Sequence, residues 1–397
     1  MTDTTLAAPA RNALIDTLRA FALIGVFMVH MFEQFEIYWA APNQNLTHTI
    51  FTTFLMGKAF SLLTLCFGLS FFILMDRAAR RGTNFSGRFA WRMAVLALIG
   101  LAHSLVYRGD ILMVLAPLGL LLIPFYRVSG KVVLTIAAVL LAQPWLWFET
   151  ANAAAGAAWA NQPFQHWADT GPAFYRASGL AETLVWNVGA GQTFKWLFFL
   201  ETGRIFSILG LFLVGLMLGR IGFFDTPERF KTPRRIALAV LAVVAVAAHF
   251  GAEPLASLLP DATRAPMARK LAAAAIGNWF DVSLMGVYVL VITELYLGPA
   301  RKPLERLAPM GRMTLTFYVA QSLVWVPIFY GFGLGAWATL PQGTALALAA
   351  GFLAVQAVIA TLWFQRFHYG PLEWLWRAAT YGTTKVPFVK AAAVQTL

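Results

Sequence analysis

LIDTLRAFALIGVFMVHMF, residues 14–32, is an apolar stretch as long as a membrane crossing, yet it contains Asp16, Arg19 and His30. In a helix, the eleven residues from Arg19 to His30 turn through about 1100°, so both side chains lie on one face, about 16 Å apart. Asp16 precedes Arg19 by one turn and is placed to pair with it. Ionisable groups in membrane helices usually face a protein interior or a water-filled cavity, so this helix predicts a site.

The composition indicates a polytopic membrane protein. Of the 397 residues, 59% are hydrophobic and 12% are charged, whereas a soluble protein carries about 25% charged residues. Cys66 is the only cysteine, which excludes a disulfide framework and a CxxC motif. The sequence has no Walker A, GxGxxG, HExxH or GxSxG motif, so ATP-driven transport and the commoner hydrolase chemistries lack support. We expect no metal and no tightly bound cofactor.

Apolar segments of suitable length predict an all-α fold with about ten transmembrane helices. The segments are Leu14–Phe32, Lys58–Met75, Arg88–Tyr107, Ile111–Tyr126, Val132–Phe148, Trp196–Gly222, Ile236–Phe250, Leu271–Leu297, Leu307–Phe332 and Thr344–Phe367. They belong to one transmembrane domain over residues 14–370, whose longest connection, 149–195, is expected outside the membrane. A cytoplasmic segment, 1–13, precedes this domain, and a cytoplasmic interfacial segment, 371–397, follows it.

The distribution of basic residues predicts the orientation in the membrane. If the N-terminus is cytoplasmic, most Lys and Arg side chains fall in cytoplasmic loops, including the cluster at residues 77–81. The outer loops then receive only Arg108, Arg176, Lys195, Arg264, Arg269 and Lys270. This asymmetry is the positive-inside signature and places both termini in the cytoplasm. The formal net charge of +12 is explained by loops that face anionic lipid, so we expect no nucleic-acid partner.

Polar residues of the spans gather at two depths. Those expected near the outer ends of spans, or in a turn beside them, are His30, Lys58, His103, Arg108, Asp110, Glu201 and Arg204. Those expected in the inner half are Asp16, Arg19, Arg88 and Arg92. This layout predicts an outer polar chamber above a basic inner vestibule.

Several of these residues also have a purely structural interpretation. Asp16 and Arg19 can form an ion pair that holds the first span against its neighbours. Glu201 and Arg204, three residues apart, can be a pair on the helix surface. His30 can lie at the headgroup boundary, although the ordinary pKa of histidine, about 6.5, suits proton transfer at neutral pH.

Five motifs are spread along the chain. They are LIDTLRAFALIGVFMVH at 14–30, FSLLTLCFGLSF at 60–71, RMAVLALIGLAHSLVYRGDIL at 92–112, GRMTLTFYVAQS at 311–322 and HYGPLEWLWRAATYG at 368–382. With this ordered set, the chain resembles over almost its whole length the YeiB-like bacterial integral membrane proteins, a family of unknown function. The resemblance implies a multi-pass protein of the bacterial cytoplasmic (inner) membrane and assigns no activity.

A more distant resemblance concerns Arg19 and His30. Their spacing is similar to the Arg-x10-His pattern in the first helix of transmembrane acyltransferases that modify cell-surface glycans, a group related to the heparan glucosaminide N-acetyltransferases. It implies acyl transfer from cytoplasmic acyl-CoA, as co-substrate, to an outer acceptor such as an envelope glycan or a lipid-linked acceptor. Arg19 would then help to hold the donor, and His30 would be the general base or carry the acyl group. His103 and Asp110 would assist at the outer mouth.

The remaining polar residues fit the same chemistry. An acyl thioester needs a base that deprotonates the acceptor and donors that stabilise the oxyanion. Lys58 or Arg204 could supply the positive group near the oxyanion, with Glu201 beside them. Arg88 and Arg92, together with the cluster at 77–81, could bind the phosphates of CoA.

Two alternatives stay open. The chain could be a carrier or flippase for an anionic or amphipathic small molecule, with Asp281, Gln321 and Gln356 along the path. It could also be a non-catalytic scaffold for another envelope enzyme. Transport without a covalent product would favour the carrier.

Overall fold

The computed structural model describes residues 12–390, which are mostly helical. The long helices are α1 (Ala13–Phe32), α3 (Lys58–Ala79), α4 (Ser86–Val106), α12 (Arg204–Arg220), α13 (Lys231–Ser257), α14 (Ala268–Leu297), α17 (Thr314–Phe329) and α18 (Gln342–Arg366). The shorter α-helices are α2 (Leu46–Phe54), α5 (Leu112–Leu120), α6 (Leu122–Phe125), α7 (Gly130–Leu141), α8 (Pro144–Ala154), α9 (Gly171–Phe174), α10 (Leu180–Val188), α11 (Ala190–Glu201), α15 (Arg301–Glu305), α16 (Ala308–Arg312) and α19 (Pro371–Tyr381). Most of the predicted segment 1–13 and the end of 371–397 lie outside the described residues.

Seven helices within residues 12–390 are long and apolar enough to cross a membrane, and the bent pair α11–α12 makes eight if it counts as one span. The chain is therefore an all-α polytopic membrane protein, as predicted. Two of the ten expected crossings are not among these candidate spans. The segment 307–332 contains the shorter helix α17, and the segment 111–126 is divided between α5 and α6.

Breaks in the helices have identifiable backbone causes. Gln143 adopts a left-handed conformation with φ of 58° between α7 and α8, and Pro144 begins α8 because its missing N–H is harmless in a first turn. Gly203, with φ of 72°, separates α11 from α12, which meet at 70°. The predicted span 196–222 is thus two helices. Glu201 ends one of them and Arg204 begins the other.

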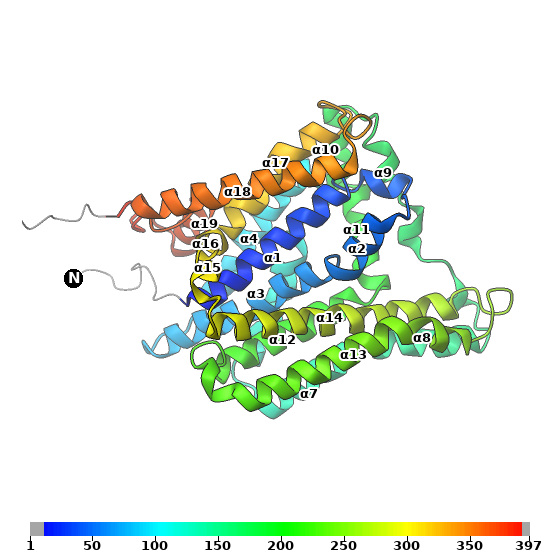
Figure 1. Cartoon of the computed structure of the whole chain (residues 1–397), viewed down its shortest axis with the longest axis horizontal. Coiled ribbons are helices and arrows are strands. Elements are labelled where there is room, and N and C mark those ends of the chain that lie inside the picture. Colours follow the sequence, from blue (N-terminus) through cyan, green and yellow to red (C-terminus); the bar gives the residue numbers. More distant parts are fainter. Residues whose placement is uncertain (1–11, 391–397) are drawn as a thin grey trace, which may run out of the picture.

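The helices form a bundle with α1 in its middle (Figure 1). Asn12 caps α1, and its side chain accepts hydrogen bonds from the N–H groups of Leu14 and Ile15. The start of α1 and the end of α18 lie at the same end of the bundle, together with the end of α3 and with α15. We call this the inner end, because the basic loops predicted to be cytoplasmic gather there. The opposite, outer end carries α9.

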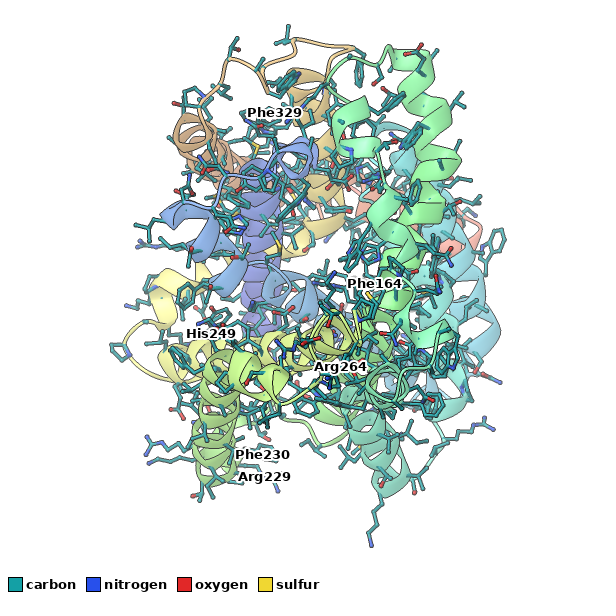
Figure 2. All side chains as sticks on the ribbon, turned by 90° about the vertical axis from the view of Figure 1, so that its right-hand side faces the viewer. Phe164, Arg229, Phe230, His249, Arg264 and Phe329 are labelled. Atoms are coloured by element: carbon teal, nitrogen blue, oxygen red, sulfur yellow. The ribbon has the colours of Figure 1, made fainter. Side chains whose placement is uncertain are left out.

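Some helices pack closely inside the bundle, whereas others present apolar side chains to the lipid. α3 crosses α12 where Gly68 and Gly215 allow backbone contact, because a Cβ at either position would overlap a backbone carbonyl of the other helix. α13 packs on α14 and exposes large apolar side chains such as Phe250, as a lipid-facing helix does. Figure 2 looks onto the outer end and shows Phe230, before α13, on the side of the molecule opposite Phe329 of α17.

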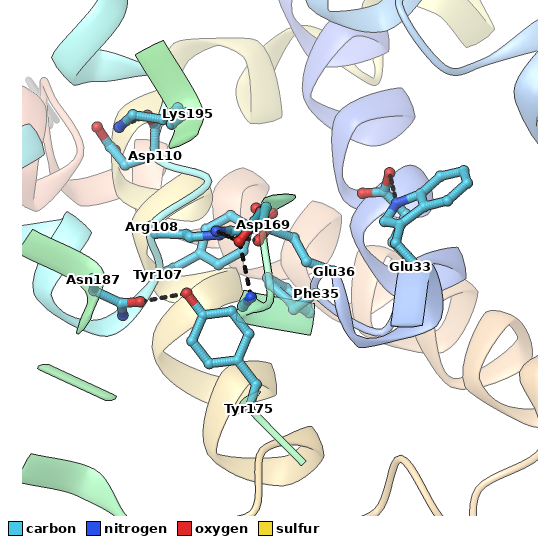
Figure 3. Close-up of polar contacts among 12 residues, drawn as sticks. Glu33, Phe35, Glu36, Tyr107, Arg108, Asp110, Asp169, Tyr175, Asn187 and Lys195 are labelled. Atoms are coloured by element: carbon cyan, nitrogen blue, oxygen red, sulfur yellow. Dashed lines mark hydrogen bonds and ion pairs between the residues drawn. The ribbon is translucent and has the colours of Figure 1, made fainter. Parts of the chain in front are cut away.

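Arg108 fastens the outer connection to the bundle. Its guanidinium donates to Glu36 through Nε and to both carboxylate oxygens of Asp169, with 2.8 Å between Nη1 and Oδ1 (Figure 3). The Arg108 side chain is 8% exposed. Although burial by itself would lower the pKa of Arg108, the charges of Glu36 and Asp169 raise it well above its ordinary value. The pair of carboxylates therefore holds one fixed positive charge at the outer end.

Replacing Arg108 by Ala is expected to destabilise the protein by about 3–5 kcal/mol, because the partly buried carboxylates of Glu36 and Asp169 lose their buried partner. Thermal unfolding in detergent measures the change. Arg301→Ala is the control, since Arg301 makes an exposed ion pair with Glu305, and it should leave the unfolding temperature unchanged. Equal unfolding temperatures for Arg108→Ala and the wild type would show that the cluster does not anchor the outer connection.

Candidate functional site

A cavity of about 790 Å³ opens within the inner half of the bundle. This volume is typical of a small-molecule site. Six arginines contribute to its walls: Arg19, Arg77, Arg80, Arg92, Arg312 and Arg377. The acidic residues among its walls are fewer: Asp16, Asp76, Asp225 and Glu373. The cavity therefore has a net positive lining, as the predicted basic vestibule requires.

Stacking on aromatic rings holds several of these guanidinium groups. Arg92 Cζ lies 3.4 Å from the ring centre of Trp376, and its Nε, which is buried, has no hydrogen-bond partner among the described residues. Arg312 Cζ lies 3.5 Å from the ring centre of Phe364. An aromatic face binds the cation without using its N–H donors, so Arg92 keeps donor capacity for an anion.

Arg19 also belongs to the cavity wall. Its Nη1 donates to Asp16 Oδ1 at 3.0 Å, and its Nη2 donates to Ser70 Oγ at 2.5 Å. The Arg19 side chain is 26% exposed, and Ser70 also lines the cavity. Arg19 is therefore both a partner of Asp16 and a cationic group that a ligand in the cavity can reach.

The C-terminal helix α19 closes one side of the cavity. Glu373 fixes it, because the N–H and the hydroxyl of Thr316 donate to the two carboxylate oxygens of Glu373 at 3.0 and 2.6 Å. Burial raises the pKa of Glu373, and the hydrogen bonds from Thr316 offset part of this rise. Trp376 donates from its indole nitrogen to the carbonyl of Arg92 at 2.9 Å. The segment expected to lie on the membrane surface thus supplies a wall of the site.

The other walls are apolar and extend to Tyr318. They include Phe67, Phe71, Leu96 and Leu115. Tyr318 lines the cavity, and its hydroxyl accepts a hydrogen bond from the N–H of Ile111 at 2.9 Å. We call this region the closed end. A ligand with an anionic head at the arginines and an apolar body toward Tyr318 would match the lining.

His103 and Asp110 form a buried pair beside the closed end. His103 Nδ1 lies 2.6 Å from Asp110 Oδ2, and the side chains are 1% and 0% exposed. The rings of His103 and Tyr318 pack edge to face with their centres 5.1 Å apart. An ionised Asp110 requires the proton on Nδ1, which leaves the lone pair on His103 Nε2, an atom without a hydrogen-bond partner among the described residues.

The surrounding backbone holds Asp110 in place. Its Oδ1 accepts from the N–H of Met113 at the start of α5, at 2.9 Å. Lys195 Nζ donates to the carbonyl of Asp110 at 3.0 Å. Gly100 of α4 allows the close approach, because a Cβ there would lie 2.9 Å from Asp110 Oδ1. Asp110 is thus fixed from three directions, which fixes the orientation of the His103 ring.

His30, near the outer end of α1, contacts Tyr107. Its Nδ1 is 3.0 Å from the Tyr107 hydroxyl, and its side chain is 15% exposed. The Tyr107 ring also lies 6.3 Å from the ring of His103, centre to centre, so Tyr107 stands between the two histidines. The chain after His30 turns through left-handed residues, with φ of 48°, 51° and 83° at Gln34, Phe35 and Glu36. Such a turn costs about 1–2 kcal/mol per residue.

The other predicted site residues lie elsewhere. Lys58 Nζ is 2.7 Å from Asp281 Oδ1, and Arg204 approaches the other oxygen of Asp281 at 3.9 Å. Glu201 binds His166 at 2.6 Å in the outer connection. Arg88 is exposed and stacks on Tyr381 without lining the cavity. Together with the His103–Asp110 pair and the Arg108 cluster, these contacts divide the single outer chamber expected from the sequence into four separate clusters.

Sequence reasoning missed several residues of the cavity. Trp376 and Glu373 come from the C-terminal helix, nearly three hundred residues after Arg92 in the chain. Tyr318, which also lines the cavity, has no distinguishing spacing in the sequence. The signal that was present is the motif HYGPLEWLWRAATYG, from which Glu373, Trp376 and Arg377 line the cavity.

Comparison with known proteins places the chain among uncharacterised relatives. Residues 218–383 match the family described as "Protein of unknown function (DUF418)". "Uncharacterized protein YxaH" of Bacillus subtilis (strain 168) is 28% identical over 94% of both chains. "Uncharacterized 39.9 kDa protein in amylase 3'region" of Bacillus acidopullulyticus is 24% identical over 95% of both chains.

"Uncharacterized protein YeiB" of Escherichia coli (strain K12) is 24% identical over 93% of this chain and 96% of its own length. No solved structure matches the chain significantly. The resemblance that the five motifs indicate is confirmed by these full-length relatives. The chain is thus a membrane protein that is similar over nearly its whole length to YeiB and to other bacterial proteins of unknown function.

Proposed function

We propose that the protein is an acyltransferase of the bacterial cytoplasmic membrane that moves an acyl group from acyl-CoA to an outer acceptor, such as an envelope glycan or a lipid-linked acceptor. The observation that carries the proposal is the cavity, which has arginines in its walls and ends in apolar walls beside the His103–Asp110 pair. The Arg-x10-His likeness of Arg19 and His30 supports it.

The donor would enter from the inner end. The phosphates of CoA are polyanionic, and guanidinium groups such as Arg92 and Arg19 bind them through charge-assisted hydrogen bonds. The apolar walls from Phe71 to Leu115 would take the less polar arm that carries the thioester. This arrangement would bring the thioester carbonyl to Tyr318.

Transfer needs a base at that carbonyl. As the acceptor oxygen or nitrogen attacks, His103 Nε2 would take its proton, and the C–S bond would then break. The imidazolium, stabilised by Asp110, would return the proton to the thiolate of CoA, which regenerates the base. The Tyr318 hydroxyl, whose proton is still available for donation, would stabilise the oxyanion. His30, which contacts Tyr107 near the outer end of α1, would receive and orient the acceptor.

The structure gives less support to a carrier that uses Asp281. That carboxylate lies 2.7 Å from Lys58 Nζ, so it is already engaged in an ion pair that fixes two helices to each other. Lys58 and Arg204 are thereby also less available as oxyanion donors than the sequence suggested.

Binding of radiolabelled acetyl-CoA and of longer acyl-CoA to the purified protein in nanodiscs tests the donor site. Arg92→Ala should weaken binding by about 10- to 100-fold, because it removes a charge-assisted contact of about 1.5–3 kcal/mol. Arg229→Ala, an exposed arginine at the same end of the molecule, is the matched control and should bind like the wild type. If the wild type binds no acyl-CoA, the acyltransferase proposal is wrong.

Turnover separates the two histidines. Asp110→Asn should leave donor binding intact and lower the transfer or hydrolysis rate by about 100-fold or more, because His103 loses the partner that fixes its tautomer. His103→Ala should do the same, while His30→Ala should raise the KM of the acceptor. A rate that is unaffected by either change at the His103–Asp110 pair would remove this pair from the mechanism.

A further inference from the structure

We propose that a seam of buried polar side chains on α17 and α18 holds a file of water molecules that connects the closed end of the cavity with the outer mouth around His30. The seam consists of Gln321, Ser322 and Trp325 of α17 and Gln356 of α18. The inference does not depend on acyl transfer. It assigns a path for water and protons to residues that neither the enzyme nor the donor site uses.

The four side chains are buried, and their hydrogen bonding is incomplete. Gln321, Ser322, Gln356 and Trp325 are 1%, 1%, 3% and 6% exposed. Gln321 Nε2 donates to Gln356 Oε1 at 3.0 Å. Gln321 Oε1, Ser322 Oγ and Trp325 Nε1 have no hydrogen-bond partner within residues 12–390. A buried polar atom without a partner costs about 1–3 kcal/mol, and ordered water is the usual partner.

The polar atoms without hydrogen-bond partners belong to residues on one face of α17. Tyr318, one turn before Ser322, lines the cavity and packs against His103, whose Nε2 is a further orphan. Trp325, one turn beyond Gln321, packs against Phe27 with 6.4 Å between ring centres. Phe27 precedes His30 by one turn of α1. The seam therefore begins at the closed end and leads toward the outer histidine.

The side chains of the seam are uncharged, so they favour a neutral ligand. The seam offers an amide acceptor, a hydroxyl that donates and accepts, and an indole donor, but no charge. A charged ligand inside the membrane needs a counter-charge or several coordinating oxygens. Water matches this mixed set, and a file of water would let a proton on His103 exchange with the outer side without passing the arginines of the inner cavity.

Hydroxyl-radical footprinting of the intact protein in nanodiscs tests the seam, because radicals formed by X-ray radiolysis of bound water label the side chains beside it. Trp325 should be oxidised at a rate comparable with that of Trp363, which is partly exposed and donates to the carbonyl of Tyr369. An unlabelled Trp325 beside a labelled Trp363 would overturn the proposal.

Two apolar substitutions test whether the polar atoms hold the water. Gln321→Leu and Ser322→Ala remove orphaned atoms, so each should cause a loss of most of the oxidation of Trp325 while Trp363 is unchanged. Thr293→Val is the matched control, since Thr293 is fully buried and donates within its own helix to Val289. If one variant fails to fold, the oxidation of Trp325 in the other variant and in the wild type still tests the proposal. Oxidation of Trp325 that survives both changes would also contradict the proposal.

Discussion

Ionisable side chains inside the apolar bundle must be paired, and this constraint shapes the whole molecule. Lys58 meets Asp281, His103 meets Asp110, and Arg19 meets Asp16. Each contact lowers the cost of an isolated charge in a medium of low dielectric constant. The Lys58–Asp281 and His103–Asp110 pairs also join different elements, so the helices can pack in one arrangement only if these partners meet.

The same constraint separates structural charges from available ones. Lys58 and Arg108 use their donors on carboxylates and neighbouring carbonyls, and they fix α2, α14 and the outer connection. Arg92 stacks on the ring of Trp376, and its Nε has no hydrogen-bond partner among the described residues. His103 likewise keeps one ring nitrogen without a partner while Asp110 holds the other. The groups that can still form a hydrogen bond with a ligand therefore lie around or beside one cavity.

Local spacing predicted the parts of the site that belong to one helix or one turn. Arg19 reaches Asp16 because the two residues are one helical turn apart. His103 and Asp110 meet because only a short turn separates the end of α4 from Asp110. Glu201 and Arg204 have the same spacing as Asp16 and Arg19, but Gly203 breaks the helix between them, so each binds a different partner. A glycine in an apolar segment does not reveal whether it bends the chain.

The apolar composition and the basic loops were enough to identify an all-α membrane protein, because the cost of exposing polar backbone in lipid leaves few alternatives. The shared face of Arg19 and His30 followed from helix geometry alone. The placement of Trp376 on Arg92, of Tyr318 beside His103 and of Asp281 on Lys58 came only with the folded structure. These residues are hundreds of positions apart in sequence, and their contacts depend on helix packing and on bends that no local pattern encodes.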